Sequence, residues 1–345
     1  MTTDGVDVIG GVDTHGHTHH AAVISEANGK LLGDKEFPAT AIEYRQLLLW
    51  LLSFGRVVKV GIEGTGSYGA GLFRYLHAEH IPVIEVNRPN RQGRRLHGKS
   101  DPIDAIAAAR AVLAETATAV PKLRSGPVEA IRLLRTTRAS AMKARKAAIN
   151  QMHSVLVGAP DELRASMAGL NRGALVGHCA RLRADVSRIG EPATTAKIVL
   201  RRLARRVQTL DGEIAETDEQ MADLVAETAP ATSAIFGVGT QATAQLLMTA
   251  GDNPHRIGSG AALARLCGTA PIPASSGTTT RYRLHRGGDR QANSAIYLIV
   301  VNRPRWHPAT HAYLQRRTAE GKTKKGNHPL PQTRRRPRDL HRAPS

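Results

Sequence analysis

The segment VDVIGGVD at residues 6–13 decides the fold of the first third of this chain. It is a short apolar run that ends on an acid, Asp13. Such runs, bounded by turn residues, predict β-strands. Four more follow it, namely HHAAVIS (19–25), KLLGDKEF (30–37), RVVKVGIE (56–63) and IPVIEV (81–86). The sequence therefore predicts a sheet within its N-terminal third.

Helical patterns alternate with these strands in a particular order. Apolar residues recur at helical spacing near 40–53, 68–79 and 101–116. The first three predicted strands follow one another closely, as antiparallel neighbours do, whereas the later ones are separated by helices, as parallel crossovers require. We therefore expect residues 1–122 to form an α/β domain of the RuvC-like (ribonuclease H-like) kind.

Four acids stand where such a fold would gather them. Asp13 and Glu63 end predicted strands, while Asp101 and Asp104 lie three apart at the start of a predicted helix, where Pro102 suits the first turn. Converging carboxylates repel one another unless cations neutralise them, and oxygen-rich sites suit Mg²⁺ or Mn²⁺. Paired metal ions of this kind drive phosphodiester chemistry. Singly, each acid is an ordinary strand end or helix start; together they favour a nuclease-like site.

The charge of the chain indicates a nucleic-acid partner. Lys and Arg number 48 against 29 Asp and Glu, which gives a net charge of +19. A polyanion is the natural counterpart of such a field, and the excess is too large to serve solubility alone. Aromatic residues make up only 3% of the chain, so contacts from Arg and Lys to the nucleic-acid backbone should dominate over base stacking.

Cysteine usage and the apolar runs favour a soluble cytoplasmic protein. Cys179 and Cys267 lie far apart and form no metal-ligand spacing, which fits a reducing compartment. The N-terminal MTTDGVDV lacks the basic and apolar regions of a signal peptide, and no apolar run reaches membrane-spanning length.

The middle of the chain, residues 123–228, is predicted to be a helical or coiled-coil connector. The stretches 133–157 and 201–228 carry apolar residues at helical spacing with dense charge between them. Their basic face is either merely solvated or lies along a nucleic-acid backbone, and the pattern leaves both open.

A C-terminal domain is predicted over residues 229–321. Gly237 and Gly239 flank Val238 directly before a helical pattern, which is typical of a helix–hairpin–helix that approaches phosphate, although an ordinary turn before a helix gives the same pattern. A Pro- and Ser-rich loop, a basic strand-like segment and another helix start follow.

Several motifs together resemble a known family. They are GVDTHGHTHHAAV (11–23), EGTGSYG (63–69), KSDPIDA (99–105), the GVG segment before a helix, and PASSG (273–277) followed by HRGGDRQANSA (285–295). The chain looks like the DEDD transposases with a serine nucleophile, the insertion-sequence family "one-ten", whose studied members are bridge-RNA-guided recombinases. The resemblance spans residues 6 to about 321.

The resemblance implies a set of site residues. Asp13, Glu63, Asp101 and Asp104 would bind Mg²⁺ or Mn²⁺, and Ser276 matches the nucleophile position, with Ser275 as the alternative. A serine hydroxyl needs a base or a metal to activate it. Nearby side chains could grip the cleaved strand: Arg281, Arg283, Arg286 and Arg290, with Asn293 either contacting DNA or capping a helix.

The chain departs from the family pattern at two places. The family usually shows a lysine shortly after the first aspartate, where this chain has Gly16, and a phosphate contact would be lost there. From Lys322 onward the sequence is basic, Pro-rich and without apolar periodicity, so residues 322–345 are predicted to be disordered. The histidines of GVDTHGHTHHAAV invite a zinc interpretation, but no further Cys or His pattern supports it.

The sequence thus favours a DNA transposase that cleaves and rejoins strands. The resemblance implies a structured guide RNA, DNA as donor and target, and a homodimer or homotetramer. An enzymatic alternative is a metal-dependent Holliday-junction resolvase or nuclease, which needs the four acids but not Ser276. A non-enzymatic alternative is an inactive nucleic-acid-binding transposase remnant.

Overall fold

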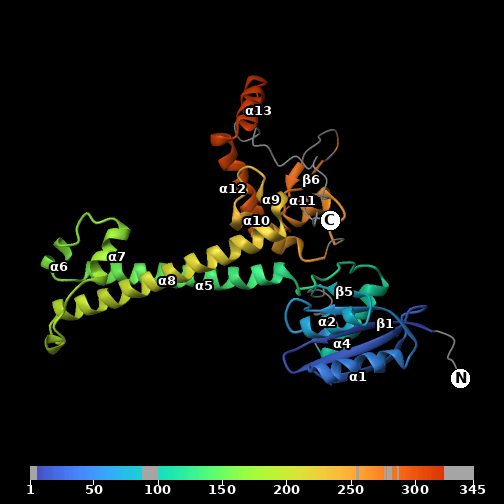
Figure 1. Cartoon of the computed structure of the whole chain (residues 1–345). Helices are drawn as coiled ribbons and strands as arrows, with labels where there is room; N and C mark the ends of the chain where they lie inside the picture. The colour runs from blue at the N-terminus through green and yellow to red at the C-terminus, as the bar shows by residue number, and fades with distance from the viewer. Residues whose placement is uncertain are drawn as a thin grey trace. The chain divides into compact units, whose positions relative to one another are not determined.

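The computed structural model describes residues 6–87, 100–253, 256–275, 277, 282–285 and 287–321, and the predicted tail lies outside them. The chain forms two compact units, residues 1–124 and 125–345 (Figure 1). None of the helices in the described ranges is long and apolar enough to cross a membrane.

The first unit is a mixed α/β structure around a five-stranded sheet. Its strands are β1 (Asp7–Thr14), β2 (Thr18–Ser25), β3 (Leu31–Pro38), β4 (Arg56–Glu63) and β5 (Val83–Val86), in the order β3-β2-β1-β4-β5. The first three strands pair antiparallel, whereas β4 pairs parallel with both β1 and β5. The predicted strands and the mixed direction of their pairing are confirmed.

Helices cover both faces of this sheet. The predicted helices are confirmed as α1 (Ala41–Leu52), α2 (Ala70–Ala78) and α4 (Asp101–Leu113). α1 and α2 pack on the face formed by even-numbered residues of β1, such as Val8 and Val12. α4 packs on the opposite face, against Ile9.

Two glycines allow α4 to lie unusually close to the sheet. Gly11 and Gly61 are register partners on neighbouring parallel strands. A Cβ atom at Gly11 would lie 2.2 Å from the Ala105 carbonyl oxygen, and one at Gly61 would lie 2.8 Å from the Ala108 carbonyl oxygen. The missing side chains therefore set how near the first turns of α4 come to β1 and β4.

The second unit is built on two long helices, as the sequence predicted, and these helices form a hairpin. α5 (Pro127–Val157) and α8 (Pro192–Thr228) run antiparallel, tied at mid-length by ion pairs from Arg138 to Asp218 (2.7 Å) and from Arg145 to Asp211. Between them the chain adds three short helices that the sequence did not predict, α6 (Asp161–Ala165), α7 (Arg172–Ala180) and the 3₁₀ helix η1 (Val186–Arg188).

Each end of the hairpin has its own apolar core. One cluster joins Ile149 and Met152 of α5 to α7 and to Leu200 of α8. The other joins Ile131 and Met221 to a following helix, α10 (Thr240–Ala250). α6 and α7 thus close one end of the hairpin, and the C-terminal helices pack at the other (Figure 1).

Short helices and a two-stranded sheet make up the rest of this unit. They are α9 (Pro230–Ser233), α10 (Thr240–Ala250), α11 (Gly260–Leu266), β6 (Pro271–Pro273), β7 (Tyr282–Leu284), α12 (Arg290–Trp306) and α13 (Pro308–Ala319). The predicted division of residues 125–321 into a connector (123–228) and a C-terminal domain (229–321) stays a prediction, since both parts fall within one compact unit.

Candidate functional site

Asp13 lies near the C-terminal end of the central strand β1, on the face of the sheet that α4 covers. Alternate residues of a strand share a face, and Ile9 and Gly11 of β1 both contact α4. Asp13 is the next residue in that series, and it is 6% exposed. Its carboxylate is therefore held against the start of α4 instead of standing free in solvent.

The start of α4 brings a second acid to the same end of β1. Asp101 and Asp104 occupy the first turn of α4, each one turn ahead of the alanines that pack on the sheet. The helix N-terminus carries partial positive charge, which favours carboxylates at this position. α4 can lie this close to the sheet only because Gly11 and Gly61 have no side chains. The same close packing places Asp101 near Asp13.

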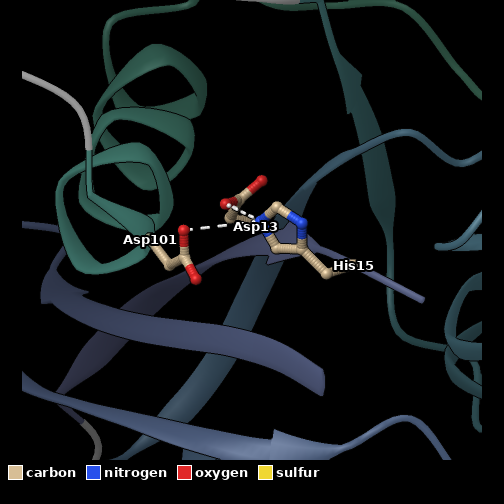
Figure 2. A group of neighbouring side chains, drawn as sticks. All are labelled: Asp13, His15 and Asp101. Atoms are coloured by element: carbon tan, nitrogen blue, oxygen red, sulfur yellow. Dashed lines mark hydrogen bonds and ion pairs between the residues drawn. The ribbon is translucent and has the colours of Figure 1, made fainter. Parts of the chain in front are cut away.

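His15 completes a cluster with these two acids. Its Nε2 atom lies 3.0 Å from Asp13 Oδ2 and 3.4 Å from Asp101 Oδ1 (Figure 2). Within the described part of the chain, Asp13, His15 and Asp101 form the single group of three or more potential metal-ligating side chains, with ligand atoms within 4.8 Å of one another. We refer to these three residues as the acid cluster.

The acid cluster suits a cation electrostatically. Two carboxylates at this distance repel each other, and an N–H on His15 Nε2 offsets only part of that repulsion. The side chains of His15 and Asp101 are 44% and 42% exposed, whereas that of Asp13 is 9% exposed. The cluster therefore opens to solvent on one side, where an ion or a phosphate could enter.

Glu63 and Asp104 lie beside the acid cluster without belonging to it. Glu63 follows Gly61 by two residues on β4, so it lies on the α4 face next to the end of β1. Thr14 Oγ1 donates a 2.7 Å hydrogen bond to the Glu63 carbonyl oxygen, which joins the two strand ends. Asp104 is buried at 4% exposure. Sequence reasoning thus placed all four acids on the correct elements, and the structure brings two of them, Asp13 and Asp101, to the same His15 ring.

The contribution of His15 was missed by sequence reasoning. The histidines of residues 15–20 were considered as a possible zinc set, but the structure separates them. His19 is fully buried and stacks on Tyr44, with ring centroids 5.6 Å apart, and His20 pairs with Asp34 at 2.7 Å. The signal that could have identified His15 is its i+2 spacing from Asp13, which extends the same face of β1.

The predicted residues of the second unit are spread over several elements. Gly237 has φ +78°, a left-handed conformation, and Gly239 precedes α10 directly. Arg303 of α12 donates from Nε to the Phe236 carbonyl oxygen at 3.0 Å, which fixes this turn. Arg283 lies exposed on β7, and Arg290 lies exposed at the start of α12. Ser276, Arg281 and Arg286 lie outside the described residues.

Asn293 and Gly16 occupy definite surroundings. Asp289, not Asn293, caps α12, because its carboxylate accepts from the backbone N–H groups of Gln291 and Ala292. Asn293 Nδ2 donates instead to the carbonyl oxygens of Cys267 and Gly268, both at 3.2 Å. Gly16 is exposed in the turn between β1 and β2, where a Cβ atom would lie 3.4 Å from the Tyr68 ring.

Comparison with known families gives two matches along the chain. Residues 10–159 match a model named for the DEDD transposases of IS110 and described as "Transposase". Residues 230–315 match a model described as "Transposase IS116/IS110/IS902 family". The two models together cover more than half of the chain, and the first includes the whole acid cluster.

Two curated proteins are similar over shorter segments. An uncharacterized 43.6 kDa protein of insertion element IS110 from Streptomyces coelicolor is 37% identical over 95 residues, which is 27% of this chain and 23% of that protein. An uncharacterized 42 kDa protein of insertion element IS900 from Mycobacterium paratuberculosis is 31% identical over 130 residues, 37% of this chain and 33% of that protein. The matched segments thus span well under two thirds of either relative.

Proposed function

Because the chain belongs to the IS110 family of transposases, we propose that it cleaves and rejoins DNA strands to move an insertion sequence. In this proposal the first unit is a RuvC-like, ribonuclease H-like domain that holds the metal. The second unit supplies the nucleophile and most of the contacts to nucleic acid.

One observation carries the proposal. Asp13 and Asp101 come from separate elements, and both lie within hydrogen-bonding or ion-pair distance of His15 at one edge of the sheet. Glu63 ends the adjacent parallel strand on the same face. Carboxylate oxygens gathered in this way fit Mg²⁺ or Mn²⁺, the ions that suit oxygen ligands and phosphodiester chemistry.

The residues of the first unit divide the work by position. Asp13 and Asp101 would hold a divalent ion, with Glu63 and Asp104 placed to bind or orient it. Such an ion supplies Lewis-acid stabilisation of charge on the phosphate and lowers the pKa of an attacking oxygen. His15 lies within reach of both carboxylates and would fix their orientation.

We assign the nucleophile to Ser276 from the family pattern, with Ser275 as its neighbour. The serine oxygen would form a bond to phosphorus while the bond from phosphorus to the departing DNA oxygen breaks. The proton leaves the hydroxyl for a base, and the departing oxygen is protonated. The resulting phosphoserine link keeps the bond energy that rejoining needs. A structured guide RNA and a homodimer or homotetramer belong to the same proposal.

The metal assignment is tested by removing single carboxylates. We expect Asp13→Asn, Glu63→Gln and Asp104→Asn each to lower strand cleavage on the order of a thousandfold, while DNA affinity is largely retained. Gel-based cleavage with Mg²⁺ and Mn²⁺ titration calorimetry provide the two measurements. Glu36→Gln, which changes an exposed acid on β3, is the matched control. Normal cleavage by Asp13→Asn, or by the wild type in EDTA, would refute the site.

The nucleophile assignment separates a transposase from a resolvase. A resolvase activates water and leaves no protein on its product, whereas a serine transposase leaves a covalent adduct when a stalled reaction is denatured. We expect that adduct to map to Ser276 by mass spectrometry and to disappear in Ser276→Ala with Mn²⁺ binding unchanged. If Ser276→Ala cuts and rejoins DNA normally, the resolvase function takes its place.

A further inference from the structure

Positive charge is unequally divided between the two units. Residues 1–124 contain 14 Lys and Arg against 13 Asp and Glu, so the first unit is close to neutral. Residues 125–345 contain 34 against 16. Whatever the first unit does with a phosphate, the second unit must supply most of the long-range attraction for nucleic acid.

Within the second unit the charge changes sign along one helix. Residues 192–210 of α8 contain five basic side chains and no acid: Lys197, Arg201, Arg202, Arg205 and Arg206. Residues 211–228 contain seven acids and no Lys or Arg. We call these segments the basic half and the acidic half of α8. The break coincides with Asp211, which pairs with Arg145 of α5.

The basic half belongs to a larger basic end of the hairpin. Over residues 139–210, which include α6 and α7, the chain has 13 Lys and Arg against four Asp and Glu. This end has its own apolar core, in which Leu200, Ala204 and Val207 of α8 are fully buried. The basic side chains therefore lie on a part of the chain that is folded around its own apolar core.

The arginines of the basic half are available to a partner. Arg202, Arg205 and Arg206 are exposed, and no acid among the described residues pairs with them. Arg202 and Arg206 are one turn apart, as are Arg201 and Arg205, so each pair repels and disfavours the helix. A polyanion would turn that repulsion into attraction, because one phosphate chain can neutralise neighbouring guanidinium groups.

The composition of this end selects the kind of partner. Residues 139–210 contain no Phe, Tyr or Trp, so they cannot stack on the unpaired bases of a single strand. Within the basic half of α8, residues 192–210, no large apolar side chain is exposed, so the basic half itself offers no apolar anchor to a protein; the exposed Val157, Val186 and Ile189 of this end lie outside α8. The kind of contact that this composition leaves is between arginine side chains and the phosphates of a double helix.

We propose that the basic half of α8, with the exposed Lys146 of α5, binds the phosphate backbone of duplex DNA, while the acidic half repels DNA and so limits the contact to the α6–α7 end of the hairpin. The choice of DNA as the polyanion rests on the proposed transposase function. The location of the contact rests on the charges and their exposure alone.

Binding measured without catalysis tests the proposal. The probe is a 40-base-pair DNA duplex of arbitrary sequence, titrated with full-length protein in EDTA by fluorescence anisotropy. We expect Arg202→Gln, Arg205→Gln and Arg206→Gln together to weaken binding about tenfold and to reduce the slope of log K against log salt by about 2.7. The matched variant Glu213→Gln, Glu216→Gln and Glu219→Gln, on the acidic half of the same helix, should bind at least as tightly as the wild type.

A charge-retaining variant separates lost contacts from lost folding. Arg202→Lys, Arg205→Lys and Arg206→Lys should bind DNA with nearly the wild-type salt slope. As a direct measure, a benzoylphenylalanine photocrosslinker at Gln208 should capture the duplex, whereas the same group at Gln220 should not. Both positions are exposed on α8.

Three results would overturn the proposal. The first is unchanged affinity of the glutamine triple variant, and the second is stronger crosslinking from Gln220. The third is a preference of the basic half for an RNA duplex over DNA, or for a second copy of the chain, seen as a salt-sensitive oligomer that the variant disrupts. Because binding is measured without any readout of strand cleavage, each of these outcomes leaves the metal and serine tests independent.

Discussion

The acid cluster of the first unit and the basic half of α8 gather charge in opposite ways. The acid cluster unites residues from the end of β1 and the start of α4, which meet only because the helix packs onto two glycines. The basic half consists of side chains on consecutive turns of a single helix, α8. A site made by tertiary packing should fail as a whole when the packing changes, whereas a site made by local sequence should weaken one side chain at a time.

The largest effect should come from breaking the packing without touching an acid. In Gly11→Ala the new methyl group would meet backbone atoms of α4, 2.2 Å from Ala105 O and 2.4 Å from Ala109 N, so the helix must move. We expect a loss of roughly 3 kcal/mol of unfolding free energy and loss of Mn²⁺ binding. Denaturant unfolding and Mn²⁺ titration calorimetry provide the two measurements.

Gly212→Ala is the matched control for that change. Gly212 lies inside α8, and nothing is within 4 Å of its Cβ position. Alanine there should stabilise the hairpin by about 0.5–1 kcal/mol and leave Mn²⁺ binding unchanged. Retention of full stability and metal affinity in Gly11→Ala would show that the acids do not depend on the close approach of α4.

This contrast also explains what the sequence could and could not predict. Local residue patterns and the lengths of the connections predict the strands, their directions and the elements that carry the four acids. Both can be obtained from short stretches of sequence. That Asp13 and Asp101 both reach His15, while Asp104 is buried, depends on how closely α4 packs on the sheet, and Gly11 gives no such signal by itself. His15 has a local signal, its i+2 spacing from Asp13, but its proximity to Asp101 depends on the same packing of α4.

In the second unit the balance is reversed. The hairpin and its charges could be read from periodicity and composition, but α6 and α7 could not, because residues 158–191 lack a long amphipathic pattern. Their helices are short and depend on the core around Met152 and Cys179. Burial in that core raises the pKa of the Cys179 thiol, which fits a packing residue and not a reactive one.

A smaller effect should follow from adding one charge beside the acid cluster. Gly16 has a backbone conformation open to other residues, since it is absent from the positive-φ set, and it lies beside the exposed ring of Tyr68. In Gly16→Lys the aliphatic stem can lie on that ring and the ammonium group can reach a phosphate near Asp13. We expect affinity for duplex DNA to rise about threefold and the salt slope to increase by about 0.9.

The control for Gly16→Lys is Gly16→Met, which has a comparable stem without the charge. It should leave the salt slope unchanged. If Gly16→Lys also leaves the slope unchanged, no phosphate approaches this turn, and the first unit would have to engage DNA from another side.

The smallest effect should appear in the pH dependence of stability in the first unit. His19, the cross-strand neighbour of Thr14, is fully buried, its Nδ1–H donates to the Thr18 carbonyl oxygen at 3.0 Å, and its Nε2 has no hydrogen-bond partner among the described residues. Burial lowers the pKa of His19, because the charged ring is desolvated. In the unfolded chain the same ring takes up a proton near its ordinary pKa of about 6.5.

Below that pH the unfolded state binds more protons than the folded state, so unfolding free energy should decrease as the pH falls from about 6.5 toward the lowered folded pKa. His19→Phe keeps a ring against Tyr44 and removes the titrating group, so the difference in unfolding free energy between wild type and variant should be constant above pH 7 and shift in favour of the variant as the pH falls. His17→Gln, at an exposed position of the same turn, should follow the wild-type curve. Parallel curves for wild type and His19→Phe would mean that His19 binds protons equally in the folded and unfolded states, and therefore that water reaches its ring on β2, the strand paired with β1. A site made by tertiary packing requires that this neighbouring strand stay buried, so the pH dependence of stability tests the packing beside Asp13.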